Sequence, residues 1–327
     1  MKKLFLSLVA AIVAVTATYA QNSLIAVLTH DGDVQAFYGS LALRQAHAAA
    51  ANGDVITLSS GTFSATNITK AITIRGAGMR ADTIAKIMPT ILVGDFYINI
   101  PDSVTERLTM EGIFHNNTMY YYSTTLKNAS FLKCRFEKID YNTNGKMDGA
   151  TFIHCDINNH IVLTSSCSAS LINCHVTNPY NDNYNTSVFE FVNCVVTLNS
   201  NIYYSTFTNC IMFTSRILGS TNNAFYCVGE PDANGNSVFK NLTDNSTNKA
   251  LEADGTGTLF TENSFYELTS EAKAKYTGTD GTEVGLYGGN LPFDPHTTAP
   301  QITKCNVASK STADGKLSVD IEVQSGE

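Results

Sequence analysis

The chain of 327 residues has no tryptophan, only 7 prolines, and charged residues make up just 15% of it. This composition favours short stacked strands joined by small polar turns over long charged helices. Acidic residues outnumber basic ones by 29 to 21, and residues 149–215 contain neither Lys nor Arg. An acidic surface of this kind argues against nucleic-acid binding and is poorly suited to hold an anionic polymer. Beyond the N-terminus no run of ~20 apolar residues occurs, so no membrane span is expected.

The first twenty residues have the build of a secretory signal peptide. They combine the pair Lys2-Lys3, an apolar centre and a small-x-small ending at Ala20. Cleavage there would leave a mature chain that begins at Gln21. No cysteine stands at that position, so a bacterial lipid anchor is not expected. We therefore predict a secreted or surface-exposed protein.

One short pattern returns five times between residues 129 and 227: an apolar residue, two variable residues, a cysteine, one variable residue and an apolar residue. The cysteines of the pattern are Cys134, Cys155, Cys174, Cys194 and Cys210. Cys227 follows in a weaker copy. A period of ~20 residues indicates a solenoid, because each unit is too short to close its own core.

The positions that stay apolar give the register of the repeat. The residue two places after each cysteine is apolar, as in Phe136 and Ile157, so both share one inward strand face. A second strand with inward-facing apolar residues precedes it. The alternation of inward and outward residues does not continue from one strand to the next, so the chain bends between them. Asn173, Asn193 and Asn209 stand at this bend, and Asn tolerates the left-handed conformation best after glycine. The repeat predicts an all-β fold, a single-stranded parallel β-helix.

In this register the cysteines stack directly above one another. Neighbouring strands are ~4.8 Å apart, whereas a disulfide prefers Cβ atoms ~3.8 Å apart. We therefore expect a column of buried free thiols, and no metal site, because ligands in a line do not converge. Cys167 and Cys305 lie outside the series, and their state is left open.

The two ends of the chain depart from the repeat. Residues 22–38 alternate around Asp31-Gly32 and predict a hairpin, and residues 40–51 predict a helix with Ser40 as N-cap and Asn52-Gly53 as its stop. Residues 262–275 predict a short helix. We expect an N-terminal cap over 21–53, the β-helix over 54–293, and a C-terminal strand pair or cap over 294–327, or the start of a further domain.

Two stretches near the start of the predicted solenoid, GDVITLSSGTF (53–63) and ITKAITIRGAG (68–78), resemble the N-terminal coil of pectin-lyase-like right-handed parallel β-helix proteins. The similarity extends to secreted members of that group from Bacteroidetes, through the 108–113 coil, the F-x-N-C repeats and the closing LYGGNLPF (286–293). The resemblance implies the fold. It does not imply an activity, since this fold carries lyases, hydrolases, adhesins and inert scaffolds alike.

Five polar residues flank the cysteine strand on successive coils and could form one outer patch: Lys133, Arg135, His154, Asp156 and His175. A polysaccharide lyase needs a base, a cation for the uronate and often Ca²⁺, so these are the weak catalytic candidates. Ca²⁺ is expected only in that case. Polar residues on the outer face of any β-helix lie in such columns, and this explains the same residues without a catalytic role. The aspartate series of polygalacturonases is absent.

Tyrosines recur in the loops before successive coils. They are Tyr120, Tyr121, Tyr122, Tyr141, Tyr180, Tyr184, Tyr203 and Tyr204. Exposed rings on adjacent coils can stack on sugars, although tyrosines that cap the core at turns fit the sequence equally well. We therefore predict a non-catalytic, glycan-associated or adhesin-like surface protein. The alternatives are a polysaccharide lyase acting on an extracellular acidic glycan and a purely structural surface protein.

Overall fold

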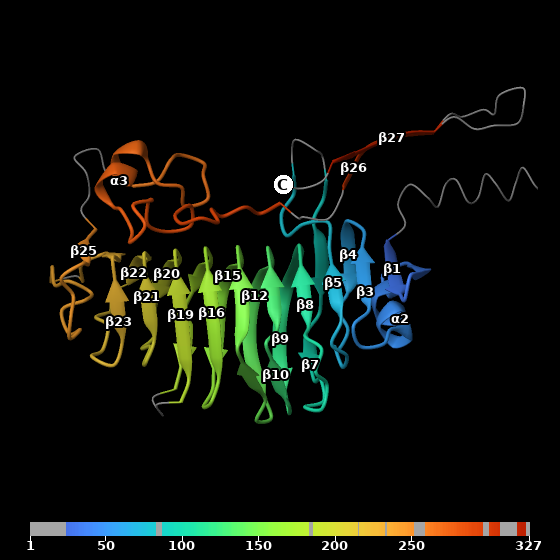
Figure 1. Cartoon of the computed structure of the whole chain (residues 1–327), viewed down its shortest axis with the longest axis horizontal. Coiled ribbons are helices and arrows are strands. Elements are labelled where there is room, and N and C mark those ends of the chain that lie inside the picture. The colour runs from blue at the N-terminus through green and yellow to red at the C-terminus, as the bar shows by residue number, and fades with distance from the viewer. Residues whose placement is uncertain are drawn as a thin grey trace, which may run out of the picture.

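The computed structural model describes residues 24–82, 87–182, 186–214, 216–232, 234–251, 259–296, 301–307 and 319–324. Strands make up 44% and helices 5% of the chain, and the parallel sheets form a β-solenoid of about nine turns. Figure 1 shows the coils stacked side by side along one long axis. The fold class predicted from the cysteine repeat is confirmed.

One wall of the solenoid is an eleven-stranded sheet in the order β2-β1-β3-β5-β8-β11-β14-β16-β19-β21-β23. Its strands are β1 (Ile25–His30), β2 (Asp33–Tyr38), β3 (Val55–Leu58), β5 (Thr73–Arg75), β8 (Thr109–Glu111), β11 (Ser130–Leu132), β14 (Ala150–Ile153), β16 (Ser168–Ile172), β19 (Val188–Val192), β21 (Thr206–Thr208) and β23 (Asn223–Phe225). From β3 onward all neighbours are parallel.

The second wall is a twelve-stranded sheet in the order β25-β24-β22-β20-β17-β15-β12-β9-β6-β4, with β7 beside β9 and β18 beside β15. Its strands are β4 (Gly61–Ser64), β6 (Thr90–Val93), β7 (Phe96–Ile98), β9 (Ile113–Tyr122), β12 (Arg135–Asn142), β15 (Asp156–Leu163), β17 (His175–Thr177), β18 (Pro179–Asn181), β20 (Val195–Leu198), β22 (Ile211–Thr214), β24 (Val228–Gly229) and β25 (Lys249–Ala250). A small parallel pair, β10 (Thr125–Lys127) and β13 (Lys146–Asp148), lies apart from both walls.

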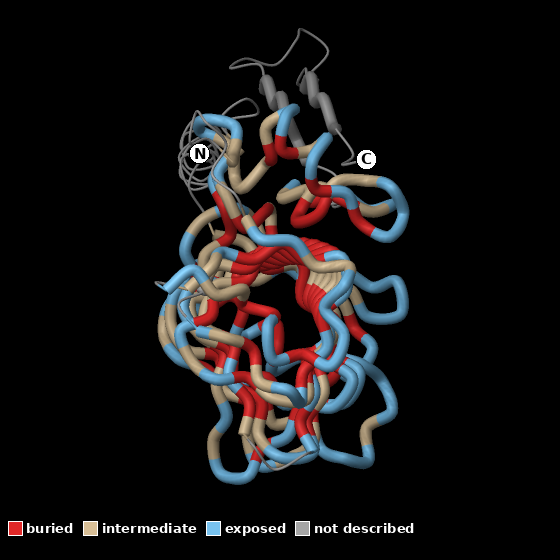
Figure 2. The backbone as a smooth tube through the Cα atoms, turned by 90° about the vertical axis from the view of Figure 1, so that its left-hand side faces the viewer, coloured by how far each residue is buried: buried red, intermediate tan, exposed pale blue. Residues whose placement is uncertain are grey.

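The apolar residue that opens each repeat is stacked on its counterpart in the next coil. Phe131 pairs in register with Phe152, and their rings stack with centroids 4.6 Å apart. Phe191 and Phe207 repeat the arrangement at 4.8 Å. Figure 2, a view along the long axis, shows buried residues on the walls of the coils. The core is therefore a set of in-register side-chain columns.

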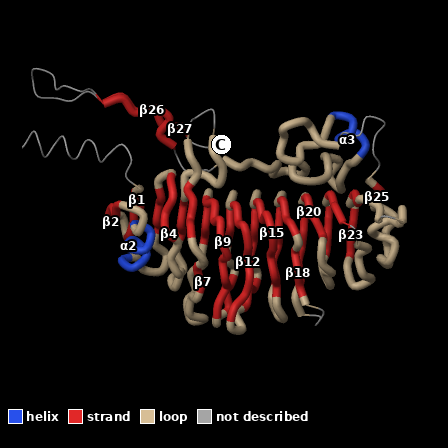
Figure 3. Tube along the Cα trace, turned by 180° about the vertical axis from the view of Figure 1, so that it is seen from behind, coloured by secondary structure: helices blue, strands red, loops and turns tan. Residues whose placement is uncertain are grey.

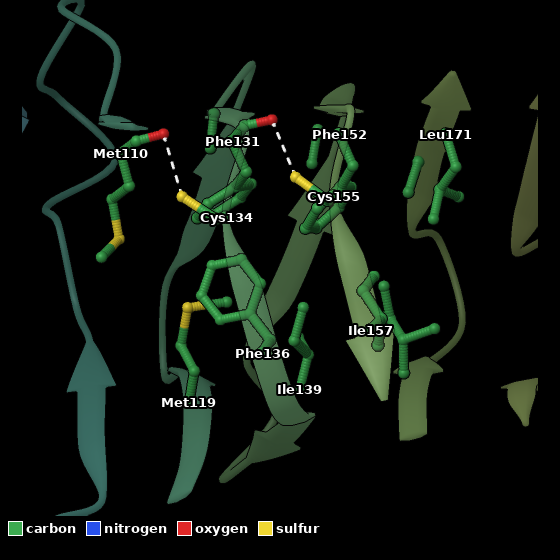
Figure 4. Packing of buried hydrophobic residues seen from close by; sticks show 14 of the residues in the cluster. Met110, Met119, Phe131, Cys134, Phe136, Ile139, Phe152, Cys155, Ile157 and Leu171 are labelled. Carbon is green, nitrogen blue, oxygen red and sulfur yellow. Dashed lines mark hydrogen bonds between the residues drawn. The ribbon is translucent and has the colours of Figure 1, made fainter. Parts of the chain in front are cut away.

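The cysteine column lies inside the solenoid as predicted. Cys134, Cys155, Cys174, Cys194 and Cys210 are all 0% exposed and unpaired. Their thiols donate to carbonyl oxygens of the neighbouring coil, for example from Cys155 Sγ to Phe131 O at 3.3 Å (Figure 4). Cys167 is also buried, with its Sγ 3.2 Å from the amide of Met147. The side chain of Cys305 lies outside the described residues.

The bend between the two strands of a coil has a left-handed backbone. Asn173, Asn193 and Asn209 have φ values of 48°, 52° and 53°, which confirms the prediction made from their residue type. His154 and Lys133 occupy the same place one and two coils before Asn173, with φ values of 53° and 50°. These two residues are therefore corner residues, and they do not belong to the strand that follows.

The N-terminal end is covered by the predicted hairpin and helix. β1 and β2 meet at Asp31-Gly32, and both turn residues have positive φ. Helix α2 (Ala42–Ala49) begins later than predicted, because Leu41 is its N-cap and no side chain caps it, so the assignment of Ser40 was wrong. Lys70, from the first coil, donates to the carbonyls of His47 and Ala48 at the helix C-terminus.

The C-terminal part leaves the solenoid earlier than the predicted boundary at residue 293. The last strand in the walls is β25, and helix α3 (Ser270–Lys275) follows, capped by the Thr269 side chain. Residues 259–296, which we call the strap, run back along the outside of the coils (Figures 1 and 3). Beyond it β26 (Gln301–Val307) and β27 (Val319–Gln324) form the predicted antiparallel pair.

Candidate functional site

The strap covers an outer face of the second wall that is polar in the early coils and apolar in the late ones. Arg135, Asp156 and His175 pair in register on neighbouring strands. The same row continues through Val195, Ile211 and Val228. These three apolar side chains are buried in a second hydrophobic cluster, together with the strap residues Leu268, Leu286 and Phe293.

Corner residues hold the strap by hydrogen bonds, coil after coil. The Asn173 amide donates to the carbonyls of Leu286 and Gly288 at 2.7 and 2.8 Å. One coil earlier, His154 Nε2 lies 3.0 Å from the carbonyl oxygen of Leu291. One more coil back, Lys133 Nζ lies 2.6 Å from a carboxylate oxygen of Asp294. The left-handed corners thus point a polar group at the strap in each of these coils.

Glycines let the strap approach the wall closely. Gly289 has φ +78°, and a Cβ built there would lie 2.3 Å from the Asn193 amide nitrogen. A Cβ on Gly285, with φ +85°, would lie 2.7 Å from Cδ1 of Ile211. A larger residue at either position would strain the backbone, and the end of the neighbouring side chain would have to shift.

Under the strap lies a buried cluster of charged groups centred on Asp156. Its two carboxylate oxygens contact His175 Nδ1 at 2.8 Å and Arg80 Nη2 at 2.8 Å, and Arg135 Nε lies 3.5 Å away. Burial would raise the pKa of Asp156, but the hydrogen bond and charge of His175 and the Arg80 guanidinium outweigh it and lower that pKa. The carboxylate is therefore ionised and internally paired.

Aromatic residues of the strap close this cluster from outside. The ring of Tyr266 stacks on His175 with centroids 4.6 Å apart, and the Arg80 guanidinium lies 3.6 Å above the ring of Phe265. As a result Asp156 is 2% exposed and His175 is 5% exposed. The predicted outer patch is contiguous around Asp156, but it is covered.

The two corner residues of the predicted patch are covered as well. His154 is 7% exposed, and burial, together with the charge of Lys133, lowers its pKa. The Lys133 ammonium is engaged with Asp294. A lyase needs its base and its cation open to a polymer. With the strap in place, four of the five candidates are buried, and Arg135, whose side chain is 33% exposed, lies beside Asp156 and over the ring of Phe114.

A different outer face, at the far ends of β7, β9 and β12, is open to solvent. Strand alternation turns Tyr97, Tyr120 and Tyr122 outward between the buried residues Phe96, Ile98, Met119 and Tyr121. Tyr97 pairs with Tyr120 across the strands, and their rings stack at 5.1 Å. Tyr122 lies edge-on to Tyr97, at 5.4 Å. The three rings form one aromatic surface.

Beside this surface lies an open pocket of about 430 Å³. Its lining combines the two tyrosines Tyr97 and Tyr122 with amide and hydroxyl side chains, namely Asn67, Asn99, Asn142, Thr69 and Thr143. These residues come from four successive coils. Among the residues that the structure describes, none of those lining the pocket carries a charge. We call this pocket with the three rings the tyrosine groove.

The other predicted tyrosines are dispersed. Tyr121 is 0% exposed and its hydroxyl donates to the carbonyl of Val162, so its inclusion among exposed sugar-facing rings was wrong. Tyr141 and Tyr180 are exposed, and Tyr203 and Tyr204 are half-buried, but none of these four lines the groove. Tyr184 lies outside the described residues. Of the eight candidates, the groove brings together Tyr120 and Tyr122.

Sequence reasoning missed Tyr97 and the strap. The alternation from Phe96 to Ile100 contained the signal for Tyr97, since it places that residue outward. The strap had a signal as well. The position directly after the repeat cysteine is apolar in Val195 and Ile211, and an apolar outward residue on two adjacent coils indicates a covering segment.

Comparisons with known proteins give no match, either to a family model, to a curated protein or to a solved structure. Within the described ranges, no group of three or more His, Cys, Asp or Glu side chains is placed to hold a metal ion. The same ranges contain no helix that is long and apolar enough to cross a membrane.

Proposed function

We propose that the protein is a secreted or cell-surface scaffold that binds glycan chains, without chemistry, at the tyrosine groove. The observation that carries the proposal is the groove itself, where half-buried, outward-facing aromatic rings adjoin uncharged amide and hydroxyl groups. Sugar rings present apolar faces and hydroxyl edges, which match aromatic surfaces and groups that both donate and accept hydrogen bonds. The secreted location rests on the composition of the first twenty residues.

Several of these polar groups are available to a ligand. The side chains of Tyr97, Tyr122 and Asn99 form no hydrogen bond with another described residue. The side-chain oxygen Oδ1 of Asn67 accepts a hydrogen bond from the backbone amide of Tyr97 at 3.1 Å. This bond fixes the Asn67 side chain beside the Tyr97 ring. A preorganised side chain lowers the entropic cost of binding.

Retention of the purified protein on a glycan array is the decisive test. We expect at least one class of polysaccharide to be retained, and we expect Tyr97→Ala and Tyr122→Ala to abolish retention while the circular dichroism spectrum is unchanged. Tyr38→Ala is the matched control, because Tyr38 is 63% exposed on the N-terminal hairpin, away from the groove. If the folded protein retains no glycan, the proposal fails and a purely structural role is favoured.

A further inference from the structure

The lining of the tyrosine groove also bears on which glycans it accepts. Its polar groups are amides and hydroxyls, contributed by residues such as Asn99, Asn142 and Thr69. Such groups pair well with sugar hydroxyls. A carboxylate or sulfate is bound tightly where Arg or Lys supplies charge-assisted hydrogen bonds. The groove offers none from its lining.

Two ammonium groups near the groove are already engaged. Lys138 Nζ lies 2.8 Å from a carboxylate oxygen of Asp140, and the hydrogen bond to Asp140 raises the pKa of Lys138. Lys70, next to Thr69 in sequence, donates to the carbonyls at the end of α2. His160 pairs in register with Lys138, and burial lowers its pKa, so it is neutral at pH 7.

Carboxylates border the tyrosine row. Asp140 pairs in register with Tyr120. Asp95 precedes Tyr97 by two residues, and its carboxylate accepts from the Thr118 amide at 2.9 Å. Asp95 and Asp140 are set against the two ammonium groups of Lys138 and Lys70, so these neighbours add no net positive charge to the groove, in a protein whose formal net charge is −8. A polyanion therefore gains no net attraction from these neighbours, and the negative charge of the whole protein opposes its approach.

From this distribution we infer that the groove selects neutral glycan chains over acidic ones, an inference that rests on the glycan-binding function proposed above. The site also crosses four coils at a spacing of ~4.8 Å, which is close to the length of one pyranose unit. A chain lying along the solenoid axis meets Thr69, Asn99, Tyr122 and Asn142 in turn. A single sugar reaches only part of this row, so affinity rises with chain length up to about four units.

The test compares polymers that differ only in charge. Polygalacturonate and its fully methyl-esterified form share one backbone, and they are immobilised beside neutral glucans, mannans, galactans and xylans and beside alginate and heparin. We expect the retained members to be neutral, with acidic counterparts bound at least about tenfold more weakly. We also expect retention that is nearly independent of salt, because no ion pair forms.

A charge variant sharpens the comparison. Asn99→Lys places a cation in the groove, and we expect it to gain retention of polygalacturonate, which high salt then abolishes. Asn116→Lys, at an exposed position of β9 outside the pocket lining, is the matched control. Equal or stronger binding of acidic glycans by the unaltered protein overturns the charge inference and leaves glycan binding intact. Failure to retain any glycan defeats the proposed function itself.

Discussion

At the residue scale, the corner of each coil combines two tasks in one side chain. Asn173 adopts a left-handed backbone, which lets the chain turn, and its amide donates to two carbonyls of the strap. Lys133 and His154 perform the same two tasks, although Lys, unlike Asn and His, is not enriched at positive φ. The corner side chain thus contacts the strap in these coils whether it is asparagine, histidine or lysine.

Asn173→Ala should separate these two tasks. The variant leaves the Leu286 and Gly288 carbonyls without their donor and puts Ala in the left-handed region, so we expect the free energy of unfolding to fall by about 2–4 kcal/mol. Asn128→Ala is the control, because Asn128 has φ +50° but is exposed. It should cost about 1 kcal/mol. Urea unfolding measures both, and equal losses would show that the strap contacts contribute nothing.

His47 gives the N-terminal cap a dependence on pH. Burial and the charge of Lys70 lower its pKa from 6.5 to about 4, and its Nε2 accepts from the Thr69 amide at 3.2 Å. Between these pH values the unfolded chain binds a proton that the folded chain does not. The free energy of unfolding should therefore fall as the pH drops from 6.5 towards 4.

Urea unfolding of the wild type and of His47→Gln, measured at several pH values, tests this. The variant has no imidazole to protonate, so its loss of stability between pH 7 and pH 4 should be smaller. A loss identical to that of the wild type would mean that His47 is not the titrating group.

At the element scale, the strap covers the apolar outer face of the late coils, as a second layer of helices or strands covers a sheet in other folds. Val195, Ile211 and Val228 would otherwise form an apolar stripe in water. Burial of these side chains stabilises the contact between the strap and the coils. The corner residues and the cluster around Asp156 fix the position of the strap. It is one continuous segment that lies against several coils, so its loosening should spread along its length.

Two leucines of the strap form a matched pair for testing this. Leu286 is 1% exposed and packs in the second hydrophobic cluster, whereas Leu291 is 57% exposed. Leu286→Ala should cost about 2–4 kcal/mol because it leaves a cavity, while Leu291→Ala should cost less than about 0.5 kcal/mol. In Leu286→Ala, hydrogen exchange should quicken in the strap first. Uniform acceleration across the coils would contradict a separately opening strap.

At the scale of the whole molecule, the cysteine column runs through the core of the solenoid, with one repeat cysteine in each successive coil. The thiols of the five repeat cysteines each donate to a carbonyl of the preceding coil, as Cys134 does to Met110 and Cys194 to Leu171. Free Cys behaves here as a small apolar residue that fills a column of fixed width. The molecule therefore protects its thiols through its fold, without disulfides among the described cysteines.

Reaction with a thiol reagent should reveal this protection. The chain has eight cysteines, and the seven described ones are buried. In native buffer we expect at most one thiol, that of Cys305, to react with Ellman's reagent, and we expect all eight to react in denaturant. A second thiol that reacts quickly in the native protein would show that a coil is open.

The sequence was sufficient to predict what depends on local repetition. The spacing of the cysteines, the apolar residues two places after them and the asparagines at the bends predicted the solenoid, its register and its buried column. Each of these signals recurs once per coil, because every coil meets the same neighbours. Residues that meet a different neighbour, such as Leu41 at the start of α2, carried no comparable signal.

By itself, then, the sequence determined the fold and its register, since stacked coils impose the same requirement on every repeat. Only the tertiary structure decided where a ligand has access. The candidates around Asp156 met as expected, but a segment more than 100 residues later in the chain covers them. Tyr97 and Tyr122 became neighbours across β7 and β9, while Tyr121 turned inward. Exposure depends on contacts between distant parts of the chain, which no repeat pattern contains.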